Sequence, residues 1–352
     1  MKRKLSPQLL TLETSLYVDI LRFFAALIVV FSHSSNSTIT GGFLWQTKGY
    51  AQTAVMIFFV LSGYVIGYVS HTKEKKLIEY SAARIARLYS VVVPAILLTI
   101  ICNIIGEQVV NSEYKGLWDF DKIAEYGRYI ATFFMMQDVW DIDFKPANNG
   151  PFWSISFEAI YYVIFAICYY TKPISKKYIS LLIVCLIAGP TILVLLPIWG
   201  LGYLAFLIHL KCKQVKHLTA YLLFIISLTL LLLSPILRDH FSFEFNTRSS
   251  IIGDYIDGIA FFMNLLAAPF IAYKLKSLLV SVKKQIRYLA GLTFVLYLCH
   301  LPLLRLLAAI SPFRENTHSF LHIIFVLGVT FIGIILVTPI TEKLKKTIKF
   351  SL

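Results

Sequence analysis

The sequence predicts an all-α fold: a polytopic membrane helix bundle of about ten transmembrane helices, with both termini in the cytoplasm. Two observations predict this fold. First, 58% of the 352 residues are hydrophobic and the mean hydropathy is +0.73, spread over the whole length. Second, most lysine and arginine residues fall between the apolar runs. Both favour lipid as the solvent, because crossing a bilayer core of about 30 Å takes roughly 20 mostly apolar residues.

The apolar runs place the individual spans. The first run is long enough to remain in the membrane, so no cleavable signal peptide is expected. We expect one membrane domain over residues 1–352. Its predicted spans lie at 17–35, 50–70, 84–106, 153–171, 178–196, 198–210, 217–234, 257–273, 288–310 and 318–340.

The net charge of +14 could indicate a nucleic-acid-binding protein, but the positions of the charges argue against it. With the N-terminus inside, the inner loops hold 21 Lys and Arg residues and the outer loops hold 8. This asymmetry is the positive-inside bias, and it predicts that both termini are cytoplasmic. The basic stretches are therefore topology signals first and contacts to anionic membrane lipids second.

One outer connection is long. Residues 107–152 form a predicted loop of 46 residues with eight Asp and Glu residues. Within it, residues 123–136 are apolar enough to form an interfacial or re-entrant helix. Loops of this length often carry function, but a solvated cap without a ligand is equally expected.

The cysteines indicate neither a metal site nor redox chemistry. Five are present, no two of them form a CxxC pair, and Cys212 alone lies in a predicted cytosolic loop. We therefore expect no metal.

The first predicted span carries charged groups, which are costly and rare inside a membrane. Arg22 and His33 are eleven residues apart, and eleven steps of 100° end only about 20° beyond three full turns. The two side chains therefore share a helix face, separated by roughly 16 Å along the axis. Asp19 falls near the same stripe. The alternative is that Arg22 is an interfacial anchor paired with Asp19.

The third predicted span opens with Arg84 and Arg87, one turn apart at the expected cytosolic entrance. Two guanidinium groups so placed suit a phosphate or pyrophosphate group, because arginine binds phosphate oxygens in a bidentate fork. The alternative is ordinary positive-inside anchoring. The other inner segments use almost only lysine, so the arginines at this position modestly favour ligand binding over anchoring.

The fourth predicted span begins with the segment WSISFE, which contains Trp153, Ser156 and Glu158. Glu158 lies about one and a half turns inside the expected outer edge, at a depth similar to that of His33. A buried carboxylate must be paired, hydrogen-bonded or protonated. We expect Glu158 to orient His33 or to pair with an arginine. A structural ion pair without a catalytic role is the alternative.

Other spans add supporting candidates. Ser62 lies in FFVLSGY with Gly63 and Gly67, a small-residue surface that also fits simple helix packing. Tyr297 and His300 lie one turn apart in the ninth span, and a lone core histidine is more often structural than catalytic. Asp254 and Asp257 are expected to be solvated residues at the membrane interface.

Taken in order, five segments resemble the acyltransferase-3 family of bacterial integral-membrane acyltransferases, of the O-antigen and exopolysaccharide O-acetyltransferase type. The ordered set is specific, although no single motif is, and it covers nearly the whole chain. One departure is Thr293, where the family often has serine. The segments are Arg22 with His33, FFVLSGY at 58–64, Arg84 with Arg87, WSISFE at 153–158 and Tyr297 with His300.

The resemblance implies an O-acyltransferase of the inner membrane that uses acyl-coenzyme A, most commonly acetyl-CoA. The acceptor would be a hydroxyl of a surface carbohydrate, such as lipopolysaccharide O-antigen or exopolysaccharide, which can be lipid-linked. The resemblance implies that His33 is the catalytic histidine and that Arg22, Arg84, Arg87 and Glu158 are important. Longer members append an extracytoplasmic domain. This chain is expected to lack an appended soluble domain, so transfer would occur within the membrane domain.

Two other classes of protein remain as alternatives. A transporter or flippase for a lipid-linked or anionic substrate would also bury Arg, Glu and His residues along a path. It should show inverted-repeat hydropathy and broken helices at matching positions, and the sequence shows neither clearly. A structural or assembly protein does not account for the four polar clusters inside the spans.

Overall fold

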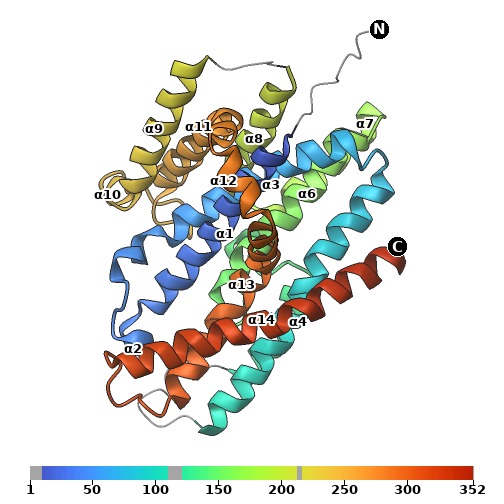
Figure 1. Ribbon diagram of the computed structural model, residues 1–352. Helices are drawn as coiled ribbons and strands as arrows, with labels where there is room; N and C mark the ends of the chain where they lie inside the picture. Colours follow the sequence, from blue (N-terminus) through green and yellow to red (C-terminus); the bar gives the residue numbers. More distant parts are fainter. Residues whose placement is uncertain (1–9, 110–120, 212–215, 352) are drawn as a thin grey trace. The chain divides into compact units, whose positions relative to one another are not determined.

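The computed structural model describes residues 10–109, 121–211 and 216–351 (Figure 1). Within these residues the chain is helical, and its only β-type pairing is an isolated bridge between Phe245 and Arg248. The predicted all-α class is therefore confirmed. Cys212 lies outside the described residues.

Within the part of the chain that the structure describes, eight helices are long and apolar enough to cross a membrane. They are α1 (Leu12–Ser34), α3 (Ala51–Thr72), α4 (Leu77–Val109), α6 (Trp153–Tyr170), α8 (Pro190–Lys211), α11 (Ile251–Lys274), α13 (Lys283–Ile310) and α14 (Phe320–Ser351). The bent pair α9 (His217–Leu232) and α10 (Ser234–His240), with 64° between its parts, brings the number to as many as nine. The chain is a multi-pass membrane protein.

The fifth and sixth predicted spans have other boundaries in the structure. The helix α7 (Ile174–Ala188) has 15 residues, fewer than a straight crossing usually takes. It ends before Gly189, whose φ of 81° lies in the left-handed region, and Pro190 begins α8. The residue before a proline is disfavoured in the α conformation, so the helix breaks here and not at the predicted residue 197.

The third predicted span also begins earlier than expected. α4 starts at Leu77 and has 33 residues, which gives a length of about 50 Å. The side chain of Glu79 accepts a hydrogen bond of 3.1 Å from the backbone N–H of Lys76 and so caps the helix start. Arg84 and Arg87 therefore lie inside this helix and not at its first turn.

The chain divides into two compact units. Unit 1 contains residues 1–25, 52–75 and 194–291, and unit 2 contains residues 26–51, 76–193 and 292–352. α1 contributes its first part to unit 1 and its second part to unit 2. Unit 1 also holds α12 (Lys276–Ser281). Among its described residues, unit 2 holds α2 (Ser37–Thr40) and the short 3-10 helices η1 (Trp45–Tyr50), η3 (Val139–Asp141) and η4 (Gly150–Phe152).

In unit 1, α3 and α8 cross with their backbones in contact. A Cβ atom added to Gly63 would overlap the carbonyl oxygen of Trp199, and one added to Gly202 would overlap that of Val60. Beside the crossing, the indole N–H of Trp199 donates a hydrogen bond of 3.2 Å to Ser62 Oγ. The predicted small-residue packing surface is thus confirmed, and Ser62 belongs to it.

A buried ion network ties α10 to α11 in unit 1. Arg238 donates hydrogen bonds of 2.7 Å to both Asp254 and Asp257, and Arg248 also pairs with Asp254 at 2.7 Å. Both aspartates are fully buried, at 0% exposure. The expectation that they are solvated was wrong, because Arg238 of α10 and Arg248 of the loop before α11 replace water as their hydrogen-bond partners.

Unit 2 contains the helix predicted within residues 107–152, as α5 (Lys122–Phe133). Asp121 caps it by accepting hydrogen bonds from the backbone N–H groups of Ile123 and Ala124. Its apolar face is exposed, through Ile123, Tyr126, Ile130 and Phe133. Such an amphipathic helix is typical of one that lies at a membrane surface.

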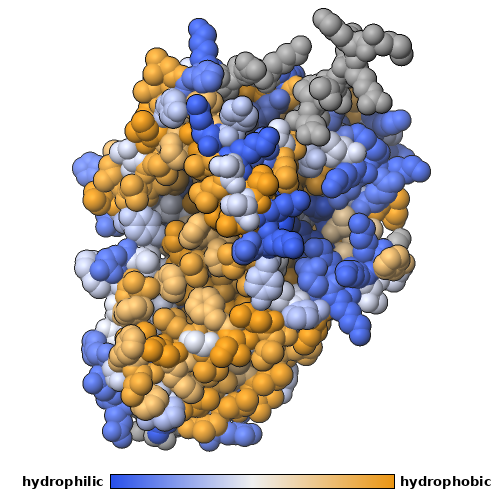
Figure 2. Space-filling model, viewed as in Figure 1, coloured by the Kyte–Doolittle hydropathy of each residue, from blue (hydrophilic) through white to orange (hydrophobic). Residues whose placement is uncertain are grey.

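α4 crosses and packs against α14 in unit 2 (Figure 1), and α6 packs against α7. Apolar side chains cover much of the face seen in Figure 2. The exposed apolar residues include Leu182 and Leu186 on α7 and Ile332 and Leu336 on α14. A lipid environment accounts for this exposure, since lipid tails solvate such side chains.

Candidate functional site

Two histidines from distant parts of the chain meet in unit 2. His33 Nδ1, near the end of α1, lies 2.8 Å from His300 Nε2 on α13. The rings are inclined by only 18° and their centroids are 5.0 Å apart. His300 is completely buried, whereas His33 is partly accessible. Of the two residues, His33 is thus the one that a substrate could reach.

The connection before α6 and the first turn of α6 hold α13 in place around His300. The Tyr297 hydroxyl lies 2.8 Å from Ser154 Oγ, and the Asn149 amide donates a hydrogen bond of 2.8 Å to the carbonyl of Leu298. Asn149 and Ser154 are buried. These bonds explain why the polar residues near WSISFE and those of the Tyr297–His300 segment occur together: they contact each other.

A second cluster joins α4 to α6. Arg87 Nη2 lies 3.8 Å from Glu158 Oε1, and the hydroxyl of Tyr162 donates a hydrogen bond to the same carboxylate oxygen. The guanidinium of Arg84 lies over the rings of Tyr80 and Tyr162, at 5.4 and 5.6 Å from their centroids. The sequence left His33 or an arginine as the partner of Glu158, and the structure places an arginine against it.

This cluster lies two to three turns inside α4. Arg84 and Arg87 lie about 10 and 15 Å from the start of α4, because each residue adds about 1.5 Å along a helix. Arg87 also stacks over Phe294 of α13, with 5.7 Å to the ring centroid. Phe294 and His300 are six residues apart, or about 9 Å along α13. The arginine cluster and the histidine pair therefore contact α13 at two positions about 9 Å apart along its axis.

Lys345 extends the positive charge of the second cluster. It lies on α14, close enough to Arg84 and Arg87 for their charges to interact. In addition, the buried Nε of Arg87 has no hydrogen-bond partner among the described residues. Lys345 itself lies 4.0 Å from a carboxylate oxygen of Glu342, so three cations face two carboxylates. The positive charge that remains suits an anionic ligand.

The remaining candidates are Asp19, Arg22, Trp153 and Ser156. Asp19 pairs with Arg287 in unit 1, so the structure shows for it a partner other than the Arg22 considered from the sequence. Arg22 lies in the part of α1 that belongs to unit 1. Trp153 of α6 packs edge-on against Phe157. Ser156 Oγ accepts a hydrogen bond of 3.3 Å from the backbone N–H of Asp138.

Residues 15–339 match the model of a protein family described as an acyltransferase domain, the acyltransferase-3 family. The chain belongs to the acyltransferase-3 family. The resemblance seen in the five segments is therefore confirmed, and the match takes in segments of both units. No curated protein and no solved structure gives a significant match to the chain. As a family member, the protein is a membrane acyltransferase.

Sequence reasoning missed two polar features of this acyltransferase. Arg305 on α13 donates hydrogen bonds to the carbonyl of Ala147 and to Asn148 Oδ1, and it lies close enough to His33 for its charge to act on that ring. It stands inside the ninth predicted span, so the rarity of intramembrane charges was a signal that could have found it. The paired asparagines Asn148 and Asn149 carry no such signal.

An acidic residue outside the spans has an unusual environment. Burial raises the pKa of Asp138 to about 6, an effect that Asp141 strengthens and Lys145 opposes. One of its carboxylate oxygens is buried without a hydrogen-bond partner among the described residues. Asp138 adjoins Ser156 through its backbone, so its charge state bears on the start of α6.

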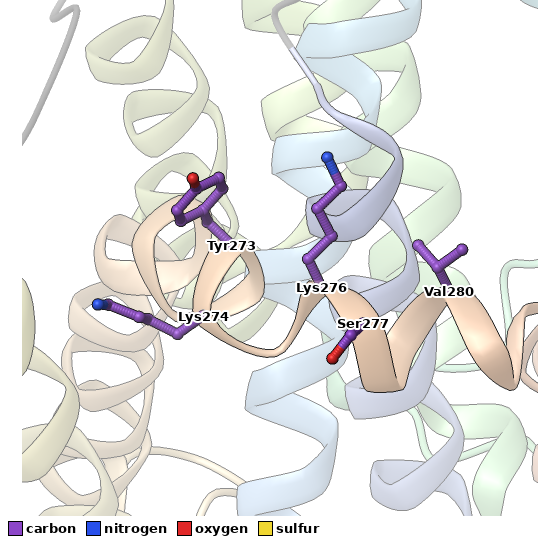
Figure 3. Close-up of a pocket in the computed structure, with 5 residues that line it drawn as sticks. All are labelled: Tyr273, Lys274, Lys276, Ser277 and Val280. Carbon is purple, nitrogen blue, oxygen red and sulfur yellow. The ribbon is translucent and has the colours of Figure 1, made fainter.

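In the described ranges, neither a metal cluster nor a shallow surface hollow of unit 1 adds to the site. Among the described residues, no group of three or more His, Cys, Asp or Glu side chains is arranged to hold a metal ion. A shallow hollow at the junction of α11 and α12 contains none of the predicted site residues, and the side chains that line it point in different directions (Figure 3). They are Tyr273, Lys274, Lys276, Ser277 and Val280.

Proposed function

We propose that this acyltransferase moves an acetyl group from cytosolic acetyl-CoA to a hydroxyl of a surface carbohydrate. The acceptor class is that of lipopolysaccharide O-antigen or exopolysaccharide, free or lipid-linked, at the outer side of the bacterial inner membrane. The observation that carries the proposal is the partly accessible residue His33, whose ring is held by His300 in a chain of this family. Acetyl is chosen because it is the commonest acyl group in the family that the five segments resemble.

The donor is expected to bind through its phosphates. Positive charge gathers in one place in unit 2, where Lys345 lies near Arg84 and Arg87. The guanidinium fork of an arginine matches the geometry of phosphate oxygens. Arg22 is proposed as a further donor contact on the sequence argument that it shares a face of α1 with His33. The histidine pair lies about 9 Å further along α13, within the reach of a pantetheine arm.

The chemistry then needs one base. His33 accepts the proton of the acceptor hydroxyl while that oxygen attacks the thioester carbon. The carbon–sulfur bond of the resulting tetrahedral intermediate breaks, and the leaving thiolate takes the proton back from His33. The products are an acetyl ester and free coenzyme A, and the histidine is regenerated. In this scheme Glu158 holds Arg87 in place and does not move the proton.

The test uses the purified full chain in nanodiscs. We expect it to bind coenzyme A and to transfer labelled acetyl from acetyl-CoA to extracted surface glycans. His33→Ala should lower turnover by on the order of 10²–10⁴, the usual contribution of general base catalysis, while coenzyme A affinity stays unchanged.

The matched control is His322→Ala, because His322 is also a buried histidine of unit 2 but bonds to Ser311 and to the carbonyl of Ile39. It should retain turnover per folded molecule. Wild-type turnover in the His33 variant would overturn the proposed mechanism. Absence of both coenzyme A binding and acetyl transfer would overturn the proposed donor.

A further inference from the structure

A chain of hydrogen bonds runs from the backbone of α13 to His33. His300 Nδ1 lies 2.8 Å from the carbonyl oxygen of Leu296, and His300 Nε2 lies 2.8 Å from His33 Nδ1. His300 therefore directs its Nδ1 at the Leu296 carbonyl, and His33 directs its Nδ1 at His300. Only the last nitrogen, His33 Nε2, lies outside this chain of hydrogen bonds.

The two rings meet edge to edge. Their centroid separation of 5.0 Å is close to the sum of the nitrogen–nitrogen distance and two ring radii, and their planes differ by only 18°. The lone pair of an imidazole nitrogen lies in the ring plane, as does an N–H bond. The in-plane contact therefore has the geometry of a directed hydrogen bond and not that of face-to-face stacking.

The first bond of the chain sets the proton positions in all the others. A backbone carbonyl can only accept a hydrogen bond, so His300 Nδ1 carries a proton. A neutral imidazole has one proton, which leaves His300 Nε2 as an acceptor. His33 Nδ1 must then be the donor, and His33 Nε2 is left with a free lone pair. A second proton on His300 would bury an unbalanced charge in a completely buried ring, at considerable cost.

We propose that His300 is a positioning residue that holds His33 in the Nδ1–H tautomer, so that Nε2 of His33 is the atom that accepts the substrate proton. This inference rests on the proposed function. When His33 becomes an imidazolium, its Nδ1–H continues to donate to His300, so the hydrogen bond persists through the reaction. His300 thus takes the orienting place that a carboxylate occupies in a Ser-His-Asp triad, without adding a second charge.

The tautomer can be measured without any turnover. The full chain, labelled with ¹⁵N-histidine and placed in nanodiscs at neutral pH, should show His33 with a protonated Nδ1 and an unprotonated Nε2. The His33 signals are identified by their loss in His33→Asn. In His300→Leu we expect both tautomers of His33, and in His322→Leu we expect the wild-type tautomer.

Kinetics provide the second measurement. His300→Leu should lower kcat by about 10²-fold, with little change in KM for acetyl-CoA, because only the proton acceptor is disturbed. His300→Gln should recover part of the loss, since its side-chain oxygen can accept the His33 Nδ1–H bond in place of Nε2. A residue that only fills space would give Leu and Gln variants with equal kcat.

The outcomes separate the two proposals. A protonated His33 Nε2 in the wild-type protein, or an unchanged tautomer in a folded His300→Leu variant, would overturn the positioning role even if acetyl transfer is confirmed. Full turnover in His33→Ala would overturn the proposed function, whatever the tautomer. If His300→Leu does not fold, the wild-type spectrum and the Gln variant still decide the matter.

Discussion

The carboxylate of Glu158 contacts both the guanidinium of Arg87 and the hydroxyl of Tyr162, and its side chain is only 15% exposed. Removing one partner of a buried ion pair costs roughly 3–5 kcal/mol, because the other charge is left without compensation. Loss of activity in a Glu158 variant would therefore not by itself show a catalytic role. His33 differs in this respect, since its contact is with another imidazole.

At the residue scale, the arginines of α4 give a prediction about donor binding. Arg84→Ala and Arg87→Ala should each weaken coenzyme A binding by roughly 1.5–3 kcal/mol, the usual size of a charge-assisted hydrogen bond, measured by calorimetry in nanodiscs. Lysine replacements should be intermediate, because they keep the charge but lose the fork. Lys346→Ala, which removes an exposed lysine of α14, is the control.

Because Arg87 pairs with Glu158, a double variant can distinguish a ligand contact of Arg87 from a purely structural ion pair. If Arg87 served only as the partner of Glu158, the double variant Arg87→Ala, Glu158→Gln would regain wild-type coenzyme A affinity. A ligand contact instead predicts that the double variant remains weak. Unchanged affinity in both single alanine variants would reduce the two arginines to structural anchors.

The raised pKa of Asp138 gives a prediction about stability. The unfolded chain ionises this carboxyl near its ordinary pKa of 3.8, whereas burial keeps it protonated in the folded protein up to about 6. Between these values the folded state holds the extra proton, so the contribution of Asp138 to stability falls as the pH rises. Above about pH 6 the folded protein carries a buried charge.

Asp138→Asn should therefore raise the thermal unfolding temperature above pH 6 and leave it unchanged below about pH 4, as measured by fluorimetry in nanodiscs. The exposed Glu244→Gln should show no such pH dependence. An equal effect of Asp138→Asn at every pH would contradict the assigned burial of its charge.

At the scale of elements, glycines decide how closely α3 and α8 approach. Gly63 and Gly202 each face a backbone carbonyl oxygen of the other helix, at a distance that leaves no room for a Cβ atom. Small residues are the usual means of close helix approach in membranes, where burial of apolar surface does not drive association. The sequence predicted this surface on α3, but it did not reveal which helix covers it.

Gly202→Ala should destabilise unit 1 by about 1–3 kcal/mol, because the added methyl group forces the two backbones apart. Gly200→Ala is the matched control, since it lies on the same helix and a Cβ atom there would meet nothing within 4 Å. The thermal unfolding temperatures of the two variants check the prediction. Equal values for both would contradict the close crossing.

At the scale of the whole molecule, topology follows from charge. We propose that both termini are cytoplasmic, with residues 71–83 inside and residues 107–152 and 235–256 outside, because the basic residues are distributed unevenly between the two sides. Reversing the orientation would place the basic loops outside, against this bias. The same orientation places the end of α1 that carries His33 toward the outer side.

Cysteine labelling tests this topology. In a variant without native cysteines, Glu244→Cys should react with a membrane-impermeant thiol reagent added to intact cells. Lys75→Cys should react only after permeabilisation. Labelling of position 75 from outside would reverse the topology and, with it, the side on which acceptor hydroxyls are proposed to bind.

The sequence by itself determined the fold class, most span positions, the helix in the outer connection and the family. It could do so because hydrophobic runs, helical periodicity and charge asymmetry are local properties of a chain in lipid. It also placed Arg22 and His33 on one helix, since their separation is a matter of helix geometry alone. The ordered motifs supplied the family without any knowledge of contacts.

Only the tertiary structure decided which side chains meet. His33 and His300 are 267 residues apart, and nothing in either segment indicates that their rings form a hydrogen bond. The choice of Arg87 as the partner of Glu158, and the burial of Asp254 beneath two arginines, likewise depend on which helices pack together. Side-chain partners across helices are set by packing geometry, which the hydrophobic pattern leaves open because many arrangements bury the same apolar faces equally well.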